Sequence, residues 1–204
     1  MTSLSRRAFV TAATASLLAG CAGQENDRPE TAHSTGTPAP SRSAGKAAPR
    51  TLARSVPVGL RIPAIGVDTP VMRLGLAADG SMQVPPIEAH DRAGWYRHSP
   101  TPGQVGPSVI LGHVTVGAYG DGVFRHLAEL RRGDRVVARL ENGDRAEFAV
   151  TSVRTVAKAD FPTGAVYGDV DRPELRLITC GGPRSGAGYL DNVIVFAAPA
   201  SASP

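Results

Sequence analysis

The sequence lacks several features that would indicate particular functions. It has two cysteines in 204 residues, aromatic residues make up 5%, and its arginines are scattered without a long basic run. Scattered positive charge without interleaved aromatic residues argues against nucleic acid as a partner. One cysteine with one nearby histidine supplies too few ligands for a metal site, so we expect no metal and no cofactor. The glycines at residues 117–120 follow no phosphate-loop pattern.

The chain also lacks an apolar run long enough to span a bilayer comfortably. A short apolar stretch, residues 11–18, follows Arg6 and Arg7 and precedes a Leu-Ala-Gly-Cys sequence that ends at Cys21. A charged start, a short apolar stretch and small residues predict a secretory signal peptide over residues 1–20. The paired arginines resemble a twin-arginine export signal. The Leu-Ala-Gly-Cys sequence resembles a bacterial lipobox, which predicts lipidation of Cys21; the alternative is a plain signal peptide with a chance cysteine.

Large apolar side chains are almost absent from residues 21–55, where prolines lie among Ser, Thr, Gly and Ala. Such a segment buries too little apolar surface to offset its loss of conformational entropy. We therefore predict a disordered tether at 21–55, one ordered domain at 56–199 and a short disordered tail at 200–204. Together with the signal peptide, this organisation predicts an exported protein that is anchored by lipid to the outer face of the cytoplasmic membrane.

Within the ordered domain, short segments alternate apolar and polar residues, as half-buried strands do. Residues 141–144, Glu-Asn-Gly-Asp, have the chemistry of a hairpin turn. Many short strands with turn residues between them predict an all-β barrel or sandwich. The segments expected to be strands are residues 60–62, 67–72, 108–111, 135–140, 147–150, 174–179 and 192–197.

One segment has helical rather than strand periodicity. Between residues 122 and 132, Val123, Leu127 and Leu130 recur at helical spacing, and Asp121 stands where it could cap the start. This pattern predicts a short helix in an otherwise all-β domain.

The position of Cys180 suggests a role in chemistry. If Cys21 is acylated it cannot form a disulfide, and Cys180 is then a lone thiol in an oxidising compartment. Such a thiol is either buried, as cysteines commonly are, or used. Cys180 is expected to end a strand, and the glycines and proline at 181–183 are expected to open the chain into a loop. The residues alone leave both the buried and the catalytic interpretation open.

A nucleophilic cysteine needs a basic or cationic partner to form its thiolate. His33 falls in the predicted tether, His126 lies off the apolar face of the predicted helix, and His90 and His98 fall in polar or proline-rich connections. His113 differs, because it comes just past the apolar strand at 108–111. Two strand ends that carry Cys and His can meet at one rim of a barrel, so His113 is the favoured partner.

The sequence around these two residues resembles the sortase family. A Leu-Gly-His sequence ends at His113 and a Leu-Ile-Thr-Cys sequence ends at Cys180, as in the paired signatures of sortases. The likeness extends from about residue 56 to 197 and is similar to the class F branch of Gram-positive bacteria. Its further fragments are residues 61–67, 93–96, 123–124, 133–134 and 189–193.

This resemblance implies a sortase-type β-barrel with one or two short helices and a cysteine transpeptidase activity. The Cys180 thiolate would cleave a sorting signal near the C-terminus of a secreted protein through a thioacyl intermediate. His113 would protonate the leaving amine and later deprotonate the incoming nucleophile. The implied partners are secreted proteins with a C-terminal sorting signal and an amino group of a cell-wall precursor, and the implied membrane attachment is the lipid on Cys21.

The sequence departs from the family at one position. Sortases generally carry an Arg at the start of the last strand, and alignment through the glycine-rich segment puts Asn192 there. An Asn amide can donate hydrogen bonds to an oxyanion but brings no positive charge. We favour Asn192 as a substrate or oxyanion contact over Arg184, which follows Cys180 in the expected loop.

Two rival interpretations remain to be weighed. L,D-transpeptidases approach their cysteine through Ser-x-Gly, whereas Cys180 follows Leu-Ile-Thr, and the helix start that carries a papain-type cysteine is missing here. The missing Arg favours a second alternative, a catalytically impaired sortase-like lipoprotein that acts as an envelope binding module. Retention of both His113 and Cys180 argues against that loss of chemistry.

Overall fold

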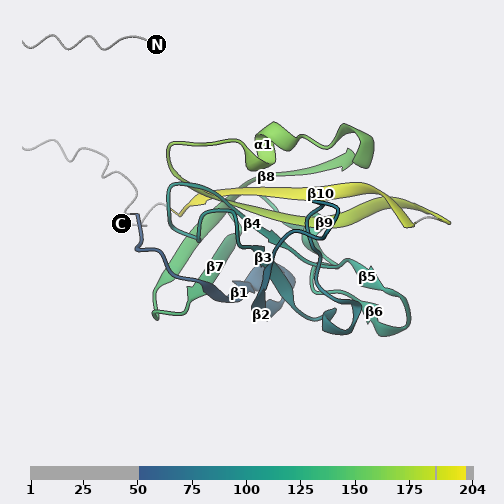
Figure 1. Ribbon diagram of the computed structural model, residues 1–204, viewed down its shortest axis with the longest axis horizontal. Helices are drawn as coiled ribbons and strands as arrows, with labels where there is room; N and C mark the ends of the chain where they lie inside the picture. The colour runs from purple at the N-terminus through teal and green to yellow at the C-terminus, as the bar shows by residue number, and fades with distance from the viewer. Residues whose placement is uncertain (1–50, 187, 201–204) are drawn as a thin grey trace, which may run out of the picture. The chain divides into compact units, whose positions relative to one another are not determined.

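The computed structural model describes residues 51–186 and 188–200 (Figure 1). The predicted signal peptide, Cys21, residues 21–50 of the predicted tether and residues 201–204 of the predicted tail lie outside the described residues. No helix in the described part of the chain is long and apolar enough to cross a membrane.

Eight strands close into a barrel in the order β1-β2-β3-β4-β9-β10-β8-β7, and β7 pairs with β1 to complete it. The all-β barrel prediction is confirmed. The barrel strands are β1 (Pro57–Ile62), β2 (Val67–Leu74), β3 (Ala93–Tyr96), β4 (Gly106–Leu111), β7 (Arg135–Leu140), β8 (Arg145–Ala157), β9 (Pro173–Ser185) and β10 (Gly188–Pro199). A separate two-stranded sheet joins β5 (Thr115–Val116) to β6 (Gly120–Asp121).

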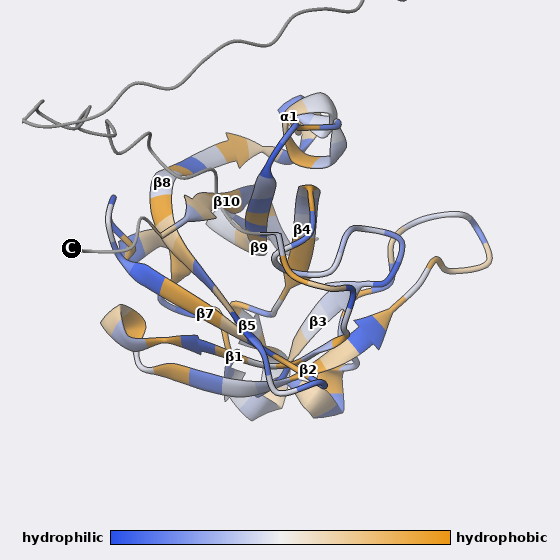
Figure 2. Cartoon of the chain, turned by 90° about the vertical axis from the view of Figure 1, so that its left-hand side faces the viewer, coloured by the Kyte–Doolittle hydropathy of each residue, from blue (hydrophilic) through white to orange (hydrophobic). Residues whose placement is uncertain are grey.

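Most neighbouring strands of the barrel are antiparallel, but two pairs are parallel: β2 with β3 and β4 with β9. Parallel strands cannot be joined by a tight turn, because the chain must return to the starting edge first. β8 and β9 also run in the same direction, because both pair antiparallel with β10. The return between them runs from Ala157 to Pro173 and carries the 3₁₀ turn η5 (Lys158–Asp160) and the helix α1 (Thr163–Tyr167). This connection lies on the outside of the barrel (Figures 1 and 2).

The barrel interior is filled by alternate residues of the strands, since successive side chains of a strand point to opposite faces. Trp95, Phe148, Leu60 and Leu177 are among the largest fully buried side chains. Figure 2 shows the corresponding alternation of apolar and polar residues along the strands. This core explains why the alternating segments of the sequence predicted strand positions correctly.

The predicted hairpin turn between β7 and β8 is confirmed. The Leu140 amide donates to the Asp144 carbonyl at 2.9 Å, and the Gly143 amide donates back to Leu140 at 3.0 Å. Gly143 has a φ of 88°, a backbone conformation that glycine adopts without a steric penalty. The Glu-Asn-Gly-Asp sequence therefore determines this turn locally.

The helix predicted at residues 122–132 is wrong. The structure has only the 3₁₀ turn η4 (Leu127–Glu129) there, and Asp121 ends β6 instead of capping a helix. Amide hydrogen bonds in this segment span three residues, as from Arg125 to Gly122 and from Leu130 to Leu127. The apolar side chains are nevertheless buried, with Leu127 at 0% exposure and Leu130 at 4%. The helical spacing of the apolar residues thus correctly indicated which side chains are buried, but tertiary packing determined that the backbone forms a 3₁₀ turn and not a helix.

The α-helix that does form, α1, was not predicted from the sequence. It is only five residues long and has no side-chain cap, so it is too short to be stable by itself. Its Val166 is fully buried in a second apolar cluster with Val109, Ile178 and Ile194, on the outer face of β4, β9 and β10. Packing against the barrel therefore stabilises this helix.

The first described residues contact the barrel. Leu52 donates its amide to the Gly103 carbonyl at 2.9 Å and packs against the main core. Ser55 accepts a hydrogen bond from the Asn142 amide at 3.1 Å. The end of the range assigned to the tether thus runs along the barrel.

We predict that Phe148→Ala lowers the free energy of unfolding by about 3–5 kcal/mol, because it leaves a cavity in the barrel core. Chemical denaturation of the domain measures this change. Val58→Ala is the control, since Val58 is 46% exposed and surface changes of this kind usually alter stability by less than about 0.5 kcal/mol. Equal effects of the two substitutions would contradict the assignment of the core.

Candidate active site

Parallel pairing of β4 with β9 brings the two predicted catalytic segments to the same rim of the barrel. Leu111, the last residue of β4, pairs with Ile178, and the next amide, from Gly112, donates to the Ile178 carbonyl at 3.1 Å. Thr179 extends this link, because its buried hydroxyl donates to the Gly112 carbonyl at 2.8 Å. His113 comes directly after Gly112, and Cys180 comes directly after Thr179.

Cys180 lies within β9, which continues to Ser185, so the expectation that it ends a strand is wrong. Gly181, which follows it, still pairs with Asp191 of β10 instead of opening a loop. The regular ladder nevertheless breaks directly beyond the pair of Gly181 with Asp191, where the register of the two strands shifts. Cys180 therefore marks the end of the regular ladder within a longer hairpin, and its side chain is partly exposed.

Asn192 is the direct cross-strand partner of Cys180. Residues opposite each other in an antiparallel pair place their side chains on the same face of the sheet. The Asn192 amide nitrogen Nδ2 donates to the Thr179 carbonyl at 3.4 Å, and the residue is partly buried. The position predicted as a polar contact is thus adjacent to the thiol.

His113 is held from two sides. Its ring nitrogen Nε2 lies 2.7 Å from the carbonyl oxygen of Pro85, a buried residue in the connection between β2 and β3. Its own carbonyl accepts the Phe124 amide at 2.9 Å. Gly122 packs so closely on this backbone that a Cβ there would lie 2.3 Å from the His113 oxygen. These contacts fix the strand end that carries His113 and orient its ring.

The carbonyl of Pro85 can only accept a hydrogen bond, so Nε2 of His113 is the donor. This contact suits the neutral ring protonated at Nε2 and also the imidazolium, whose two nitrogens are both donors. Pro85 gave no signal in the sequence, because its role depends on where the connection between β2 and β3 passes.

An apolar shelf lies on the same face of the sheet as Cys180. It comprises the second cluster of Val109, Ile178, Ile194 and Val166, with the partly buried side chains of Tyr96, Leu111, Phe161 and Tyr167 against it. Ile178 and Ile194 form a cross-strand pair. Each lies two residues along its strand from Cys180 and Asn192, respectively, so the two pairs are neighbours on this face. The sequence showed these residues as apolar but could not show that Ile178 and Ile194 lie next to the thiol on this face.

Aromatic rings from the connection that carries α1 border this shelf. Tyr96 meets Tyr167 edge to face with ring centroids 6.4 Å apart, and Phe161 lies 6.1 Å from Tyr167. Burial raises the pKa of the Tyr167 hydroxyl, and the nearby Tyr96 phenol adds to the effect. Tyr167 also approaches Met82, at 4.0 Å between Oη and Sδ. These rings therefore form an aromatic group that packs α1 against β3 and the connection before it.

The structure places Arg184 near the tip of the β9–β10 hairpin. Its guanidinium lies over the ring of Tyr189, 5.1 Å from the centroid. The Tyr189 hydroxyl in turn lies 3.0 Å from the hydroxyl of Thr115 in β5. The hairpin tip is thus tied to the β5–β6 sheet, and Arg184 takes part in that attachment.

The other described histidines have different surroundings. His126 is exposed and lies 2.7 Å from Glu129, as expected of a solvated residue. His98 is also exposed, whereas His90 is partly buried and stacks on Tyr119 with ring centroids 5.1 Å apart. Among the described residues there is no group of three or more His, Cys, Asp or Glu side chains that could hold a metal ion.

The comparison with protein families matches residues 60–200 to the sortase domain. The chain belongs to the sortase family. The matched range covers the whole barrel except the start of β1, and it includes His113, Cys180 and Asn192. A comparison with curated proteins gave no match.

Solved sortase structures share this fold. Sortase A from Corynebacterium diphtheriae is 20% identical with a TM-score of 0.53, and the match covers 74% of this chain and 64% of that one. Sortase C-1 from Actinomyces oris is 19% identical with a TM-score of 0.53, with 70% and 72% covered. The sortase D5 transpeptidase of Clostridium perfringens is 22% identical with a TM-score of 0.53, with 72% and 79% covered. This sortase therefore spans less than two thirds of the Corynebacterium protein, and at these identities the likeness concerns the fold.

We predict that Thr179→Val in this sortase lowers the free energy of unfolding by about 1–3 kcal/mol. The substitution keeps the shape of the side chain but leaves the buried Gly112 carbonyl without the hydroxyl that donates to it. Thr179→Ser is the control, because it retains the hydroxyl. Denaturant unfolding measures both variants, and equal stability of Thr179→Val and the unmodified domain would show that this bond does not hold β4 to β9.

Proposed function

We propose that this sortase is a cysteine transpeptidase in which Cys180 is the nucleophile and His113 is its acid–base partner. The observation that carries the proposal is the strand register: β4 delivers His113 to the rim at which β9 carries Cys180, and β10 puts Asn192 opposite the thiol. A nucleophile and an amide donor then share one face of the sheet, and a proton carrier follows the strand that ends at the same rim.

In the first half-reaction the Cys180 thiolate attacks a peptide carbonyl carbon of the sorting signal. The C–N bond breaks, a thioester forms on Cys180, and the leaving amine takes a proton from the His113 imidazolium. In the second half-reaction an acceptor amine attacks the thioester and gives a proton to His113. The C–S bond then breaks, so the thiolate and the imidazolium are restored and a new amide is released.

The hydrogen bond from His113 to Pro85 supports this role of the imidazole. A carbonyl acceptor at Nε2 fixes the orientation of the ring, which leaves Nδ1 as the nitrogen that exchanges the proton. The Asn192 amide would contact the oxyanion or the substrate backbone, where a neutral donor stabilises developing negative charge without supplying a full positive charge.

We infer that the substrates are secreted proteins with a C-terminal sorting signal and that the acceptor is an amino group of a cell-wall precursor. The assignment to class F rests on the sequence fragments that resemble that branch. Export through a twin-arginine-like signal and lipidation of Cys21 would hold the enzyme at the outer face of the cytoplasmic membrane, where both partners are found.

A second candidate function is a binding module that keeps the sortase barrel without turnover. The observation that favours it is Asn192, a neutral residue at the cross-strand position next to the thiol, where sortases generally carry Arg. The partly exposed Cys180 argues for chemistry, since a site that only binds has no need of a bare thiol. Reactivity of that thiol distinguishes the two functions.

We predict an acyl adduct on Cys180. The domain from residue 51 onward is incubated with a pool of Leu-Pro-x-Thr-Gly-type peptides and examined by intact-protein mass spectrometry. The expected result is a mass increase equal to an acyl fragment, which Cys180→Ala abolishes and His113→Ala reduces by at least about 100-fold, the usual scale of acid–base catalysis. Turnover that survives Cys180→Ala would rule out the cysteine mechanism. No adduct, together with a thiol inert to iodoacetamide, would favour the binding module.

We predict that Asn192→Ala lowers kcat/KM for a cleaved peptide by roughly 10-fold to 100-fold without abolishing turnover, because it removes one donor from the site. Arg184→Ala is the matched control, and we expect less than about 2-fold change, since surface changes away from the site have small effects. Steady-state cleavage of a fluorogenic peptide measures both. The reverse order of the two effects would transfer the contact role to Arg184.

A further inference from the structure

The carbonyl that accepts from the His113 ring belongs to the first of two consecutive prolines, Pro85 and Pro86. The ring of a proline holds its own φ at about −65°. A proline also restricts the residue before it to an extended ψ. Pro85 is subject to both restrictions, so the direction in which its carbonyl points is limited by covalent geometry as well as by tertiary contacts.

Pro86 has no packing role that explains its ring. Pro85 is buried, whereas Pro86 is exposed, with an extended backbone of φ −55° and ψ 151°. Its carbonyl accepts the Ala89 amide at 2.9 Å in the 3₁₀ turn η2 (Ile87–Ala89), a bond that any residue at this position could form. What proline adds at position 86 is therefore the restriction on Pro85.

The segment that carries the two prolines begins at a fixed point. The Gln83 amide donates to the Gly75 carbonyl at 3.0 Å, and the Gly75 amide donates to Oε1 of Gln83 at 2.7 Å. Gly75 directly follows β2, so both bonds hold Gln83 at the end of a barrel strand. Residues 83–90, the strap, therefore start from the barrel two residues before Pro85.

The strap also ends at a fixed point, and that point is close to His113. The His90 carbonyl accepts the Val123 amide at 2.9 Å. Val123 lies between Gly122, which packs on the His113 backbone, and Phe124, whose amide donates to the His113 carbonyl. The segment that contacts the imidazole ring is thus bonded to the segment that holds the backbone of the same residue.

A rigid acceptor at Nε2 selects one tautomer of the neutral His113 ring. If the proton were on Nδ1, the bare Nε2 would face the Pro85 oxygen at 2.7 Å, with two acceptors against each other. A carbonyl that cannot turn away excludes that arrangement. The tautomer that remains has a bare Nδ1, which is the nitrogen that takes up a proton in the proposed mechanism.

We propose that Pro86 is a positioning residue for His113. It restricts the Pro85 carbonyl, and this carbonyl holds the ring in the tautomer and orientation that leave Nδ1 free. The consequence for turnover rests on the proposed transpeptidase function. The tautomer itself can be measured without a substrate, so the two can fail separately.

Two exposed prolines provide a matched pair of variants. Pro86→Ala releases ψ of Pro85 and removes little packing, because Pro86 is exposed. Pro63→Ala is the control: Pro63 is also exposed, but it begins the 3₁₀ turn η1 (Pro63–Ile65) between β1 and β2.

A second pair of variants acts at the start of the strap. Gln83→Met keeps the approximate length of the side chain but removes the oxygen that accepts from Gly75. Gln83→Glu retains an accepting oxygen, so we expect it to behave as the unmodified domain does.

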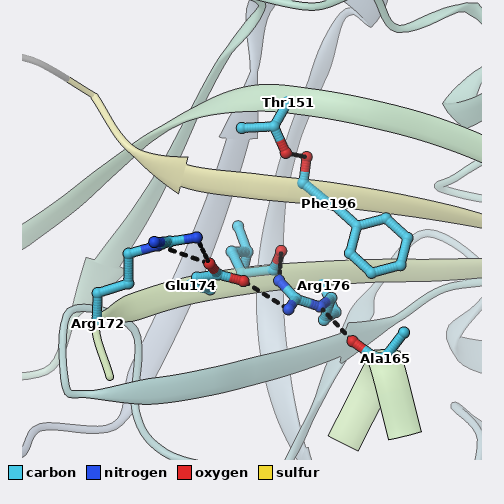
Figure 3. A network of polar contacts seen from close by, with 7 residues as sticks. Thr151, Ala165, Arg172, Glu174, Arg176 and Phe196 are labelled. Carbon is cyan, nitrogen blue, oxygen red and sulfur yellow. Dashed lines mark hydrogen bonds and ion pairs between the residues drawn. The ribbon is translucent and has the colours of Figure 1, made fainter. Parts of the chain in front are cut away.

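The buried network around Arg176 provides a control for general loosening of the domain (Figure 3). Arg176 donates to the Glu174 carboxylate at 2.6 Å and to the Ala165 carbonyl at 3.3 Å, which ties α1 to β9. Within the described part of the chain, no bond of this network reaches His113. Arg176→Lys keeps the charge but loses the planar fork that forms both bonds, so it disturbs the fold away from the strap.

The first measurement is NMR of the domain labelled with ¹⁵N-histidine, at a pH at which the rings are neutral, with His113→Ala to assign the signals. We expect the unmodified domain to show His113 protonated at Nε2 alone. Pro86→Ala and Gln83→Met should show a second, Nδ1-protonated form. Gln83→Glu, Pro63→Ala and Arg176→Lys should keep the single form.

The second measurement is steady-state cleavage of a peptide found by the acylation assay. For Pro86→Ala we expect kcat to fall by about 5-fold with KM within about 2-fold, because the loss concerns a hydrogen bond that orients a reacting group and not substrate binding. Pro63→Ala should match the unmodified enzyme.

Several results would overturn the proposal. A single Nε2-protonated form in both Pro86→Ala and Gln83→Met would do so, as would equal changes in Pro63→Ala or Arg176→Lys, which would indicate general loosening. If Pro86→Ala does not fold, Gln83→Met and its rescue by Gln83→Glu decide the question. An altered tautomer with unchanged kcat would overturn the role in turnover. Absence of an acyl-enzyme in the unmodified domain would overturn the transpeptidase function, whereas the NMR result would still decide the tautomer.

Discussion

The parallel pairing of β4 with β9 is the interaction on which the rest of the site depends. Because parallel strands run in the same direction, their carboxyl ends meet at one edge of the sheet. Two hydrogen bonds extend that pairing beyond the strand ladder: the Gly112 amide donates to the Ile178 carbonyl, and the Thr179 hydroxyl donates to the Gly112 carbonyl. His113 and Cys180 are the next residues along the chain after Gly112 and Thr179. A separate return of the chain, between β8 and β9, carries α1, because these two strands both pair antiparallel with β10 and therefore run in the same direction.

The two faces of β9 carry different residues: one face fills the barrel core, and the other carries Cys180. Leu175, Leu177 and Thr179 point into the barrel and are buried, whereas Arg176, Ile178 and Cys180 face outward beneath and beside α1. The inner residues hold the strand in register. Substitutions that change their volume are poorly tolerated, because each side chain fills space in a closed core. The outer residues are a partly exposed thiol, a buried apolar side chain and a buried cation, and the backbone that the inner residues fix positions all three.

Much of the fold could be predicted from the sequence, and the failures have identifiable causes. Alternation gave the strand positions, since the inner face of a barrel strand must be apolar. The helix expected at residues 122–132 failed because buried apolar residues at helical spacing also arise from 3₁₀ turns wrapped around a core. Cys180 was expected to end a strand because glycines follow it, yet β9 continues to Ser185 and Gly181 still pairs with Asp191. The helix α1 gave no periodic signal, because five residues are too few to show one.

The sequence by itself determined which residues can carry chemistry and where the strands run: a lone thiol in the described domain, a histidine after an apolar strand, and segments whose alternation requires one buried face. Tertiary structure alone decided which of these residues meet. Asn192 lies opposite Cys180, Pro85 accepts from His113, and Arg176 reaches Ala165 only because strands distant in sequence pair in one register. Register is set by the closure of the whole barrel, in which every strand restricts its two neighbours, and so it cannot be read from any one segment.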